Sequence, residues 1–167
     1  MNLKEQKKIA EKKLEDIQNR IKSKSTIKEK GETKFYQFSQ NNSGGSFVDN
    51  EDVCEYVFIE AHSVKEANLL ADNFGIYFDG CEQGTDCSCC GDRWYPVSEG
   101  DIKPMIYEED VREIYESGFR QKCIIHYLDG KKEKIIFKTE KDCPKHKYKQ
   151  QHNIGKKCEV CGKWEKN

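Results

Sequence analysis

The sequence predicts an α+β fold: a small, mainly antiparallel sheet with two short helices, a long N-terminal helix and a C-terminal zinc-finger-like tail. Three observations predict it. Short aromatic and β-branched runs lie between turn residues, several segments have apolar residues at helical spacing, and Cys and His residues near the C-terminus are paired at metal-ligand spacing. We expect a helix at 1–31, an acidic body at 34–140 and a basic Cys/His tail at 141–167.

Residues 1–30 are rich in Lys, Glu and Gln and contain no Pro or Gly, which favours a helix. Its apolar residues follow the alternating three- and four-residue steps of a heptad seam: Leu3, Ala10, Leu14, Ile17 and Ile21. Because an isolated helix with so narrow a seam is marginal in water, we expect it to pack on its own body or on another helix, with a homo-oligomer as one outcome. A partly frayed, solvated extension is the alternative.

The first half of the body reads as strands and turns. A strand at 35–38, a turn-rich loop at 41–45 and a return strand at 47–48 predict a hairpin, and residues 56–61 form another strand.

A helix follows, because Ser63 and Glu66 have the spacing of a capping box and Gly75 can end the helix. Residues 76–78 read as the next strand. A second helix is predicted over 108–117, where acidic residues crowd the first turn and apolar ones share a face.

The last strands of the body form a predicted hairpin. The segments 122–128 and 134–138 flank Asp129-Gly130, a strong turn signal. Together these elements predict a mainly antiparallel sheet.

Composition narrows the class of protein. Hydrophobic residues make up 35% of the 167 residues and charged residues another 35%, so the core must be small. Nine cysteines behind a Lys-rich N-terminus indicate a reducing compartment and metal ligation, and we expect a cytoplasmic protein. No apolar run approaches the roughly twenty residues that cross a bilayer, so no membrane association is expected.

Charge is segregated along the chain. Residues 34–118 carry eighteen Asp and Glu against five Lys and Arg, whereas residues 119–167 carry six against fourteen. An acidic body attracts basic partners, and a Lys-rich tail attracts phosphates or acidic proteins.

The best-supported chemistry is a zinc site in the tail. Cys143 and His146 form one chelating pair and Cys158 and Cys161 another, which together complete the four-coordinate shell of a structural Zn²⁺ ion. His152 lies between the pairs and could replace His146 as the fourth ligand.

A second cysteine cluster lies in the body. Cys87 and Cys90 are in Cys-x-x-Cys register, and Cys81 could join them on one zinc ion with a ligand from outside this set. The candidates for that position are Cys89, Cys54, His62 and His126. A metal-independent thiol cluster is the alternative.

Three motif strings carry a resemblance: FYQFSQNNSGG at 35–45, GIYFDGC at 75–81 and DCSCCGDRWYP at 86–96. Over about residues 34–96, two-fifths of the chain, the sequence resembles a family of small uncharacterised proteins encoded by tailed bacteriophages. The resemblance implies an accessory protein that acts in the cytoplasm of a bacterial host, and it transfers no activity.

The residues support binding better than catalysis. No Ser or Cys lies in a recognisable nucleophile turn. His152-Asn153 beside a Cys-x-x-Cys pair is similar to zinc-braced nucleases of the His-Asn-His type, but the six residues after Cys161 leave no room for their metal-binding helix.

Two binding hypotheses remain. In the favoured one, the acidic body binds a host protein stoichiometrically. In the other, the tail binds nucleic acid through its lysines, with Tyr148 and Trp164 available for stacking on bases. Those lysines are Lys145, Lys147, Lys149, Lys156, Lys157 and Lys163.

Overall fold

The computed structural model describes residues 31–115, 122–151 and 155–166. The chain divides into two units, residues 1–32 and 33–167. The predicted N-terminal helix and its heptad seam lie outside the described residues. The second unit contains all of the described helices and strands.

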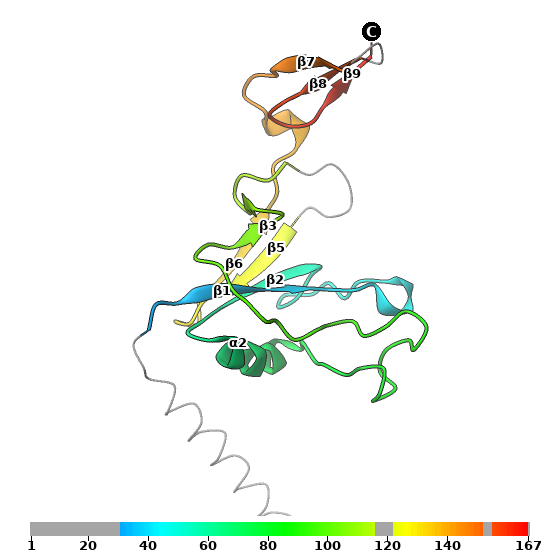
Figure 1. Ribbon diagram of the computed structural model, residues 1–167, viewed down its shortest axis with the longest axis vertical. Helices are drawn as coiled ribbons and strands as arrows, with labels where there is room; N and C mark the ends of the chain where they lie inside the picture. Colours follow the sequence, from blue (N-terminus) through cyan, green and yellow to red (C-terminus); the bar gives the residue numbers. More distant parts are fainter. Residues whose placement is uncertain (1–30, 116–121, 152–154, 167) are drawn as a thin grey trace, which may run out of the picture. The chain divides into compact units, whose positions relative to one another are not determined.

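A mixed four-stranded sheet forms the centre of this unit (Figure 1). Its order is β1 (Lys34–Ser39), β2 (Tyr56–Ala61), β5 (Lys122–His126) and β6 (Lys132–Ile136). β1 is antiparallel to β2, and β5 is antiparallel to β6. β2 and β5 run parallel, with Val57 opposite Ile124, because the long connection between them returns the chain in the same direction. The sheet is therefore mixed, with the predicted antiparallel pairing in two of its three pairs of strands.

The structure confirms the predicted strands at 35–38 and 56–61, but their pairing differs from the expectation. β1 pairs with β2, and Tyr36 lies opposite Ile59. The expected return strand at 47–48 is absent from the described sheet: η1 (Ser43–Gly45) is a short 3-10 turn, and residues 46–49 are irregular. A loop long enough to reach β2 replaces the tight hairpin.

The helix after Ser63 is confirmed as α2 (Val64–Ala71), extended by the 3-10 turn η2 (Asp72–Phe74). The Ser63 hydroxyl accepts a hydrogen bond from the Glu66 backbone N–H at 3.2 Å, which is the N-cap interaction. The Glu66 carboxylate reaches one residue further than a capping box requires and accepts from the His62 N–H at 2.7 Å. The segment 76–78 forms no strand, although Ile76 is fully buried.

The predicted second helix over 108–117 is wrong for its described part. β3 (Met105–Ile106) and β4 (Glu109–Asp110) form a small hairpin instead, followed by a turn at 111–113 and by Tyr115, which forms an isolated bridge with Lys138. The apolar residues at helical spacing are nevertheless buried: Val111 has no exposed surface and Ile114 is 7% exposed. A hairpin and turns can thus bury the same residues that would form one face of a helix.

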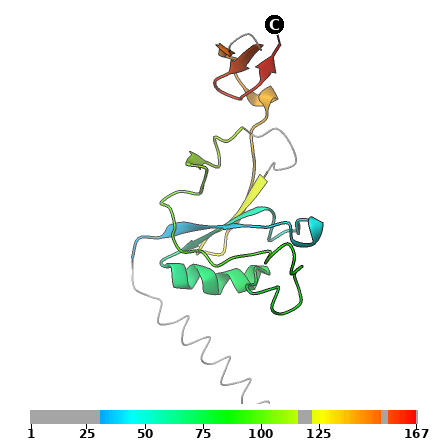
Figure 2. The ribbon, with the colours of Figure 1, turned by 45° about the vertical axis from the view of Figure 1, so that its right-hand side comes forward.

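Both faces of the sheet are covered by apolar side chains. Along β2, Val57 and Ile59 belong to one buried cluster, while Tyr56 and Phe58 belong to the other, as expected from the two-residue period of a strand. α2 lies along one face, where Ala67 and Ala71 join the first cluster (Figures 1 and 2). Among the described residues, no helix is long and apolar enough to cross a membrane.

The C-terminal segment forms a separate small sheet. After the 3-10 turn η3 (Glu140–Asp142), β7 (Tyr148–Gln151), β8 (Gly155–Cys158) and β9 (Trp164–Glu165) pair antiparallel in that order. We call residues 143–166 the ribbon. The predicted ligands lie in the segment before β7 and in and beside the turn between β8 and β9.

Candidate metal centres

The ribbon brings the four predicted ligands together. One ligand atom from each of Cys143, His146, Cys158 and Cys161 lies within 4.8 Å of every other. Cys161 Sγ and His146 Nδ1 are 3.4 Å apart. Tetrahedral zinc with bonds of about 2.3 Å to sulfur and 2.0 Å to nitrogen separates these atoms by about 3.5 Å. The four residues therefore fit a closed Zn²⁺ site. His152, the alternative ligand and the basis of the nuclease hypothesis, lies outside the described residues.

Backbone geometry explains why the second ligand pair converges. The Gly162 N–H donates to the Cys158 carbonyl at 3.0 Å, and Gly162 has φ +72°, a left-handed conformation that favours glycine. The turn is joined to the segment that carries the first pair, because the Glu159 N–H donates to the Lys147 carbonyl at 2.9 Å. The spacing of Cys158 and Cys161 is thus converted into a compact turn that lies next to Cys143 and His146.

The electrostatics of the ribbon cysteines favour a bound cation. Although burial alone would raise it, hydrogen bonds from the Cys161 N–H and from His146 lower the pKa of Cys158 to about 6. Burial and the neighbouring Cys161 and Cys158 raise the pKa of Cys143 to about 11. Hydrogen bonds therefore stabilise a thiolate at Cys158, and the close approach of the cysteines opposes further negative charge at Cys143. A Zn²⁺ ion would stabilise both thiolates.

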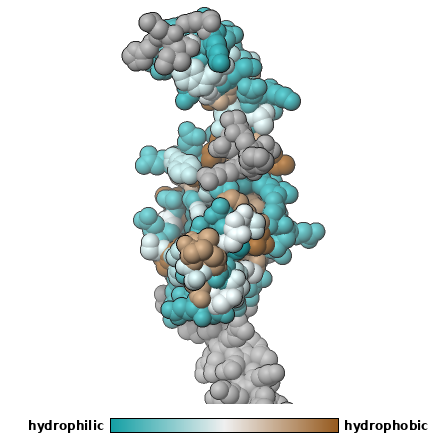
Figure 3. Space-filling view, turned by 90° about the vertical axis from the view of Figure 1, so that its right-hand side faces the viewer, coloured by the Kyte–Doolittle hydropathy of each residue, from teal (hydrophilic) through white to brown (hydrophobic). Residues whose placement is uncertain are grey.

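The ribbon buries few apolar side chains. Among its described residues, Cys158 is the one buried apolar side chain, at 1% exposure. On the face drawn in Figure 3, hydrophilic residues dominate the ribbon at the top, whereas hydrophobic ones reach the surface of the body. Since so small a core cannot offset the entropy of ordering the chain, metal binding would supply the missing folding free energy.

A second group of thiols lies in the loop after η2. Cys87, Cys89 and Cys90 have their Sγ atoms within 4.8 Å of one another. The predicted set was Cys81, Cys87 and Cys90; in the structure Cys89 completes the group, and the Cys81 thiol instead lies 3.5 Å from the Cys87 carbonyl.

Two of the other candidate ligands have partners elsewhere. Cys54 is buried and donates to the Tyr56 carbonyl at 3.2 Å, and His126 is stacked on Phe74 with ring centroids 3.6 Å apart. His62 is not a member of the group either. Cys89 is the candidate that the structure supports.

Polar contacts hold in place residues 81–93, which we call the thiol loop. The Asp86 carboxylate, 1% exposed, accepts hydrogen bonds from the Tyr77 hydroxyl at 2.8 Å and from the Arg93 N–H at 2.7 Å. The Arg93 guanidinium donates to the Gln40 side chain at 2.9 Å, and the Ser43 hydroxyl accepts from the Cys87 N–H at 2.9 Å. The loop is thereby fixed to the segment that follows β1.

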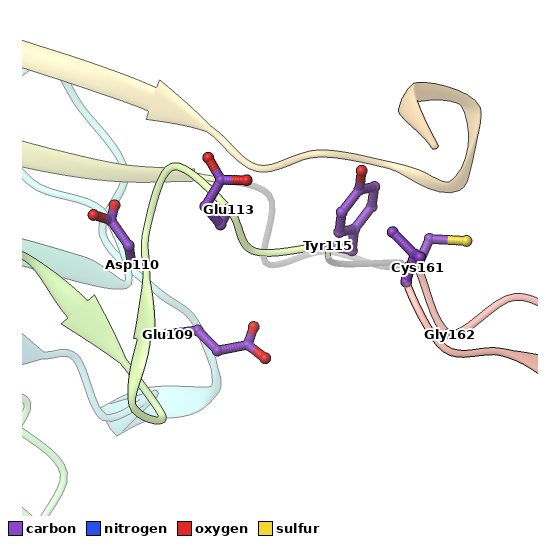
Figure 4. Close-up of a pocket in the computed structure, with 7 residues that line it drawn as sticks. Glu109, Asp110, Glu113, Tyr115, Cys161 and Gly162 are labelled. Atoms are coloured by element: carbon purple, nitrogen blue, oxygen red, sulfur yellow. The ribbon is translucent and has the colours of Figure 1, made fainter. Parts of the chain in front are cut away.

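A shallow acidic hollow adjoins Cys161 (Figure 4). Its lining residues are Glu109, Asp110, Glu113, Tyr115, Val160, Cys161 and Gly162. Figure 4 shows the Cys161 thiol pointing away from the carboxylates of Glu109 and Glu113. The cysteine therefore faces its own ligand group.

The register of the ribbon reveals one relationship that sequence reasoning missed. Lys149 lies directly opposite Lys157, and Lys157 lies directly opposite Trp164, so the three side chains share one face. We call this row the Lys–Lys–Trp face. Lys156 belongs to the other face, opposite Gln150 and Glu165. All these lysines were candidates, but the sequence alone does not give the strand register that separates them.

The fold and these groups define a class: an α+β domain whose Cys and His clusters could hold a metal such as zinc. The chain belongs to the family described as Domain of unknown function (DUF7296), whose model matches residues 33–145. The match includes the thiol loop and Cys143, and it ends before the other three ribbon ligands. Comparison with curated proteins and with solved structures found no match.

Proposed function

We propose that this chain is a zinc-stabilised binding protein whose ribbon binds single-stranded nucleic acid through the Lys–Lys–Trp face. The observation that carries the proposal is the register that aligns Lys149, Lys157 and Trp164 across three adjacent strands. Two cations next to an exposed aromatic ring can contact a phosphate backbone while a base stacks on the ring.

The charges on this face favour an anionic partner. Like charges directly opposite each other destabilise a pair of strands. Lys149 has a counter-ion in Glu159, with Nζ and Oε1 3.6 Å apart, but both side chains are more than half exposed and such a pair contributes little. A phosphate between the two lysines would relieve their repulsion.

The aromatic member of the face is accessible. Trp164 is 50% exposed, whereas Tyr148 lies beside His146, with ring centroids 5.5 Å apart, on the face of the buried Cys158. Trp164 is therefore the better platform for a base. Stacking on an indole ring suits single strands, whose bases are free to leave their neighbours.

The negative charge of the body repels nucleic acid less than the number of its Asp and Glu residues suggests. Asp49 pairs with Lys122, Asp52 pairs with Lys132 at 3.0 Å, and Glu113 pairs with Lys138. The Asp86 carboxylate is buried and accepts a hydrogen bond from Tyr77, so it does not face a partner. We therefore favour the nucleic-acid hypothesis over the host-protein hypothesis that the sequence favoured.

Tryptophan fluorescence of the full chain tests the proposal. Trp94 is 1% exposed, so a base can quench only Trp164. We expect an oligothymidine to quench the emission, and Trp164→Ala to weaken binding about 5- to 150-fold, the usual loss for one stacked base. Unchanged emission in the presence of the oligonucleotide, or unchanged affinity of the variant, would contradict the proposal.

A second candidate function rests on the β3–β4 turn. Tyr107 is 80% exposed beside Glu108 and Glu109, and Tyr is one of the residue types enriched among the hot spots of protein interfaces. The phage resemblance makes a host protein the expected partner, bound stoichiometrically. The direct test is affinity capture from bacterial lysate with the wild type and with Glu108→Lys/Glu109→Lys. Equal recovery of every partner by both proteins would remove this candidate.

A further inference from the structure

We propose that Cys87, Cys89 and Cys90 bind a second zinc ion through three thiolates, with a fourth coordination position that is open to a thiol from outside the chain. The proposal is independent of nucleic-acid binding by the ribbon. It rests on the backbone geometry of the thiol loop, the sulfur distances and the exposure of the cluster.

The turn from Cys87 to Gly91 in the thiol loop has the same hydrogen bond as the turn from Cys158 to Gly162 in the ribbon. In Cys87-Ser-Cys-Cys90-Gly91 the Gly91 N–H donates to the Cys87 carbonyl at 3.0 Å, just as Gly162 donates to Cys158. Gly91 has φ +85°, in the same left-handed region as Gly162. Two Cys-x-x-Cys-Gly segments far apart in the sequence therefore adopt one backbone conformation, which directs the first and last thiol of each toward one point.

The sulfur distances are close to those of a thiolate-bound ion. Zinc–sulfur bonds of about 2.3 Å at tetrahedral angles separate two sulfurs by about 3.8 Å. Cys89 and Cys90 have their Sγ atoms 3.6 Å apart, and Cys87 and Cys89 have theirs 2.8 Å apart. An ion would move Cys87 and Cys89 apart by about 1 Å, which an exposed cysteine such as Cys89 can accommodate.

Hydrogen bonds from polar side chains hold the backbone of the thiol loop in position. The backbone N–H of Cys87 is hydrogen-bonded to Ser43, and the Asn41 side chain donates to the Cys90 carbonyl at 2.8 Å. The Asp92 carboxylate accepts from the Cys81 N–H at 2.6 Å, which holds the start of the loop against its end. Supports of this kind orient metal ligands in known sites.

The fourth position lies toward solvent. Cys89 and Cys90 are exposed, and among the described residues no other Cys, His, Asp or Glu joins the group. Zinc sites with three protein ligands take a water or a substrate at the open position. With three sulfur donors already bound, a thiol is the ligand whose chemistry matches the site.

Zinc content of the purified full-length chain tests the ligand set. We expect about two ions per chain in the wild type and about one in Cys89→Ser. Cys81→Ser is the matched control because it removes a thiol from the same loop, and it should retain about two ions. Circular dichroism and the emission of the buried Trp94 check that the body of each variant has folded.

Cobalt substitution tests the open position. Addition of 2-mercaptoethanol should strengthen the sulfur-to-cobalt absorption of the wild type. It should leave Cys89→Ser unchanged, because that variant retains only the four-ligand ribbon site. The proposal is overturned if Cys89→Ser keeps about two zinc ions, if Cys81→Ser loses one, or if added thiol has no spectral effect. Loss of an ion through Cys81→Ser would instead indicate a closed site in which Cys81, Cys87 and Cys90 are joined by a fourth ligand. None of these outcomes depends on whether the ribbon binds nucleic acid.

Discussion

Asp86 and Arg93 form a buried pair across the thiol loop: the Arg93 Nε lies 3.6 Å from the Asp86 carboxylate, which also accepts from the Arg93 backbone N–H. The carboxylate is 1% exposed and the guanidinium side chain 11% exposed. Removing one member leaves a charge with little access to water. We therefore expect the loss of one member to destabilise the body. The pair also positions the cysteines that lie between its two members in the sequence.

Asp86→Asn should destabilise the body by about 3 kcal/mol, because the substitution keeps the size of the side chain and leaves the Arg93 charge uncompensated. Urea unfolding followed by the emission of Trp94 measures the change, in a Trp164→Phe background. Glu82→Gln is the matched control in the same loop, where Glu82 is exposed, and we expect a change below about 0.5 kcal/mol. A loss no larger than that of the control would show that the pair is not stabilising.

Chelation of zinc should unfold the ribbon and leave the body folded. The ribbon has one buried apolar residue among those described, whereas the body has two apolar clusters. Limited proteolysis with and without EDTA measures whether the ribbon is folded. Cleavage should appear beyond residue 142 only when zinc is removed. Cys161→Ser should reproduce the chelated pattern. A protease-resistant ribbon in EDTA would mean that its fold does not need the metal.

The β3–β4 hairpin turns through two non-glycine residues of positive φ, Tyr107 at 52° and Glu108 at 67°. Two-residue turns of this kind favour Asn-Gly, because a left-handed conformation costs about 1–2 kcal/mol for other residues. Tyr107→Asn/Glu108→Gly should therefore stabilise the body by about 0.5–1 kcal/mol, once the greater freedom of glycine in the unfolded chain is subtracted. Thermal unfolding is the measurement. A lower midpoint in the double variant would contradict this interpretation of the turn.

His126 should make the body less stable in acid. Burial lowers the pKa of His126, and its hydrogen bond to the Asp52 carbonyl, 2.8 Å from Nε2, only partly offsets this. The neutral ring is thus favoured in the fold, while the unfolded chain takes up a proton near pH 6.5. The contribution is complete above about pH 6.5 and is lost as pH falls toward the lower folded pKa.

The comparison of wild type with His126→Gln isolates this contribution. Glutamine can still donate to Asp52, but it does not titrate. The midpoint of thermal unfolding should fall more between pH 7 and pH 5.5 in the wild type than in the variant. Parallel decreases would assign the acid sensitivity to other groups, including the thiols of the proposed zinc sites.

Local signals in the sequence predicted local structure well. The helix after Ser63, its end near Gly75 and the hairpin around Asp129-Gly130 depend on caps and turns within a few residues, and the structure confirms them. The ligand spacing of the ribbon is equally local. The structure brings Cys143, His146, Cys158 and Cys161 together as that spacing predicted.

Partners distant in sequence could not be predicted in the same way. β1 pairs with β2 rather than with residues 47–48, and the parallel pairing of β2 with β5 depends on a connection of about sixty residues. Which of Lys156 and Lys157 lies on the same face as Trp164 depends on the register of the three ribbon strands. The pairing and the register of these strands are decided by how side chains pack on both faces of a sheet. A single sequence does not show that packing.

The central claim is that the Lys–Lys–Trp face binds single strands, and the salt dependence of oligothymidine affinity tests it most directly. Lys149→Gln/Lys157→Gln should weaken binding and reduce the slope of log K against log salt by about 1.4, the value for two lost phosphate contacts on a single strand. Lys145→Gln/Lys156→Gln carries the same net charge, keeps the Lys–Lys–Trp face and should bind nearly as the wild type does. If both double variants lose the same affinity and slope, or if the wild type shows no salt-dependent binding, the claim is wrong.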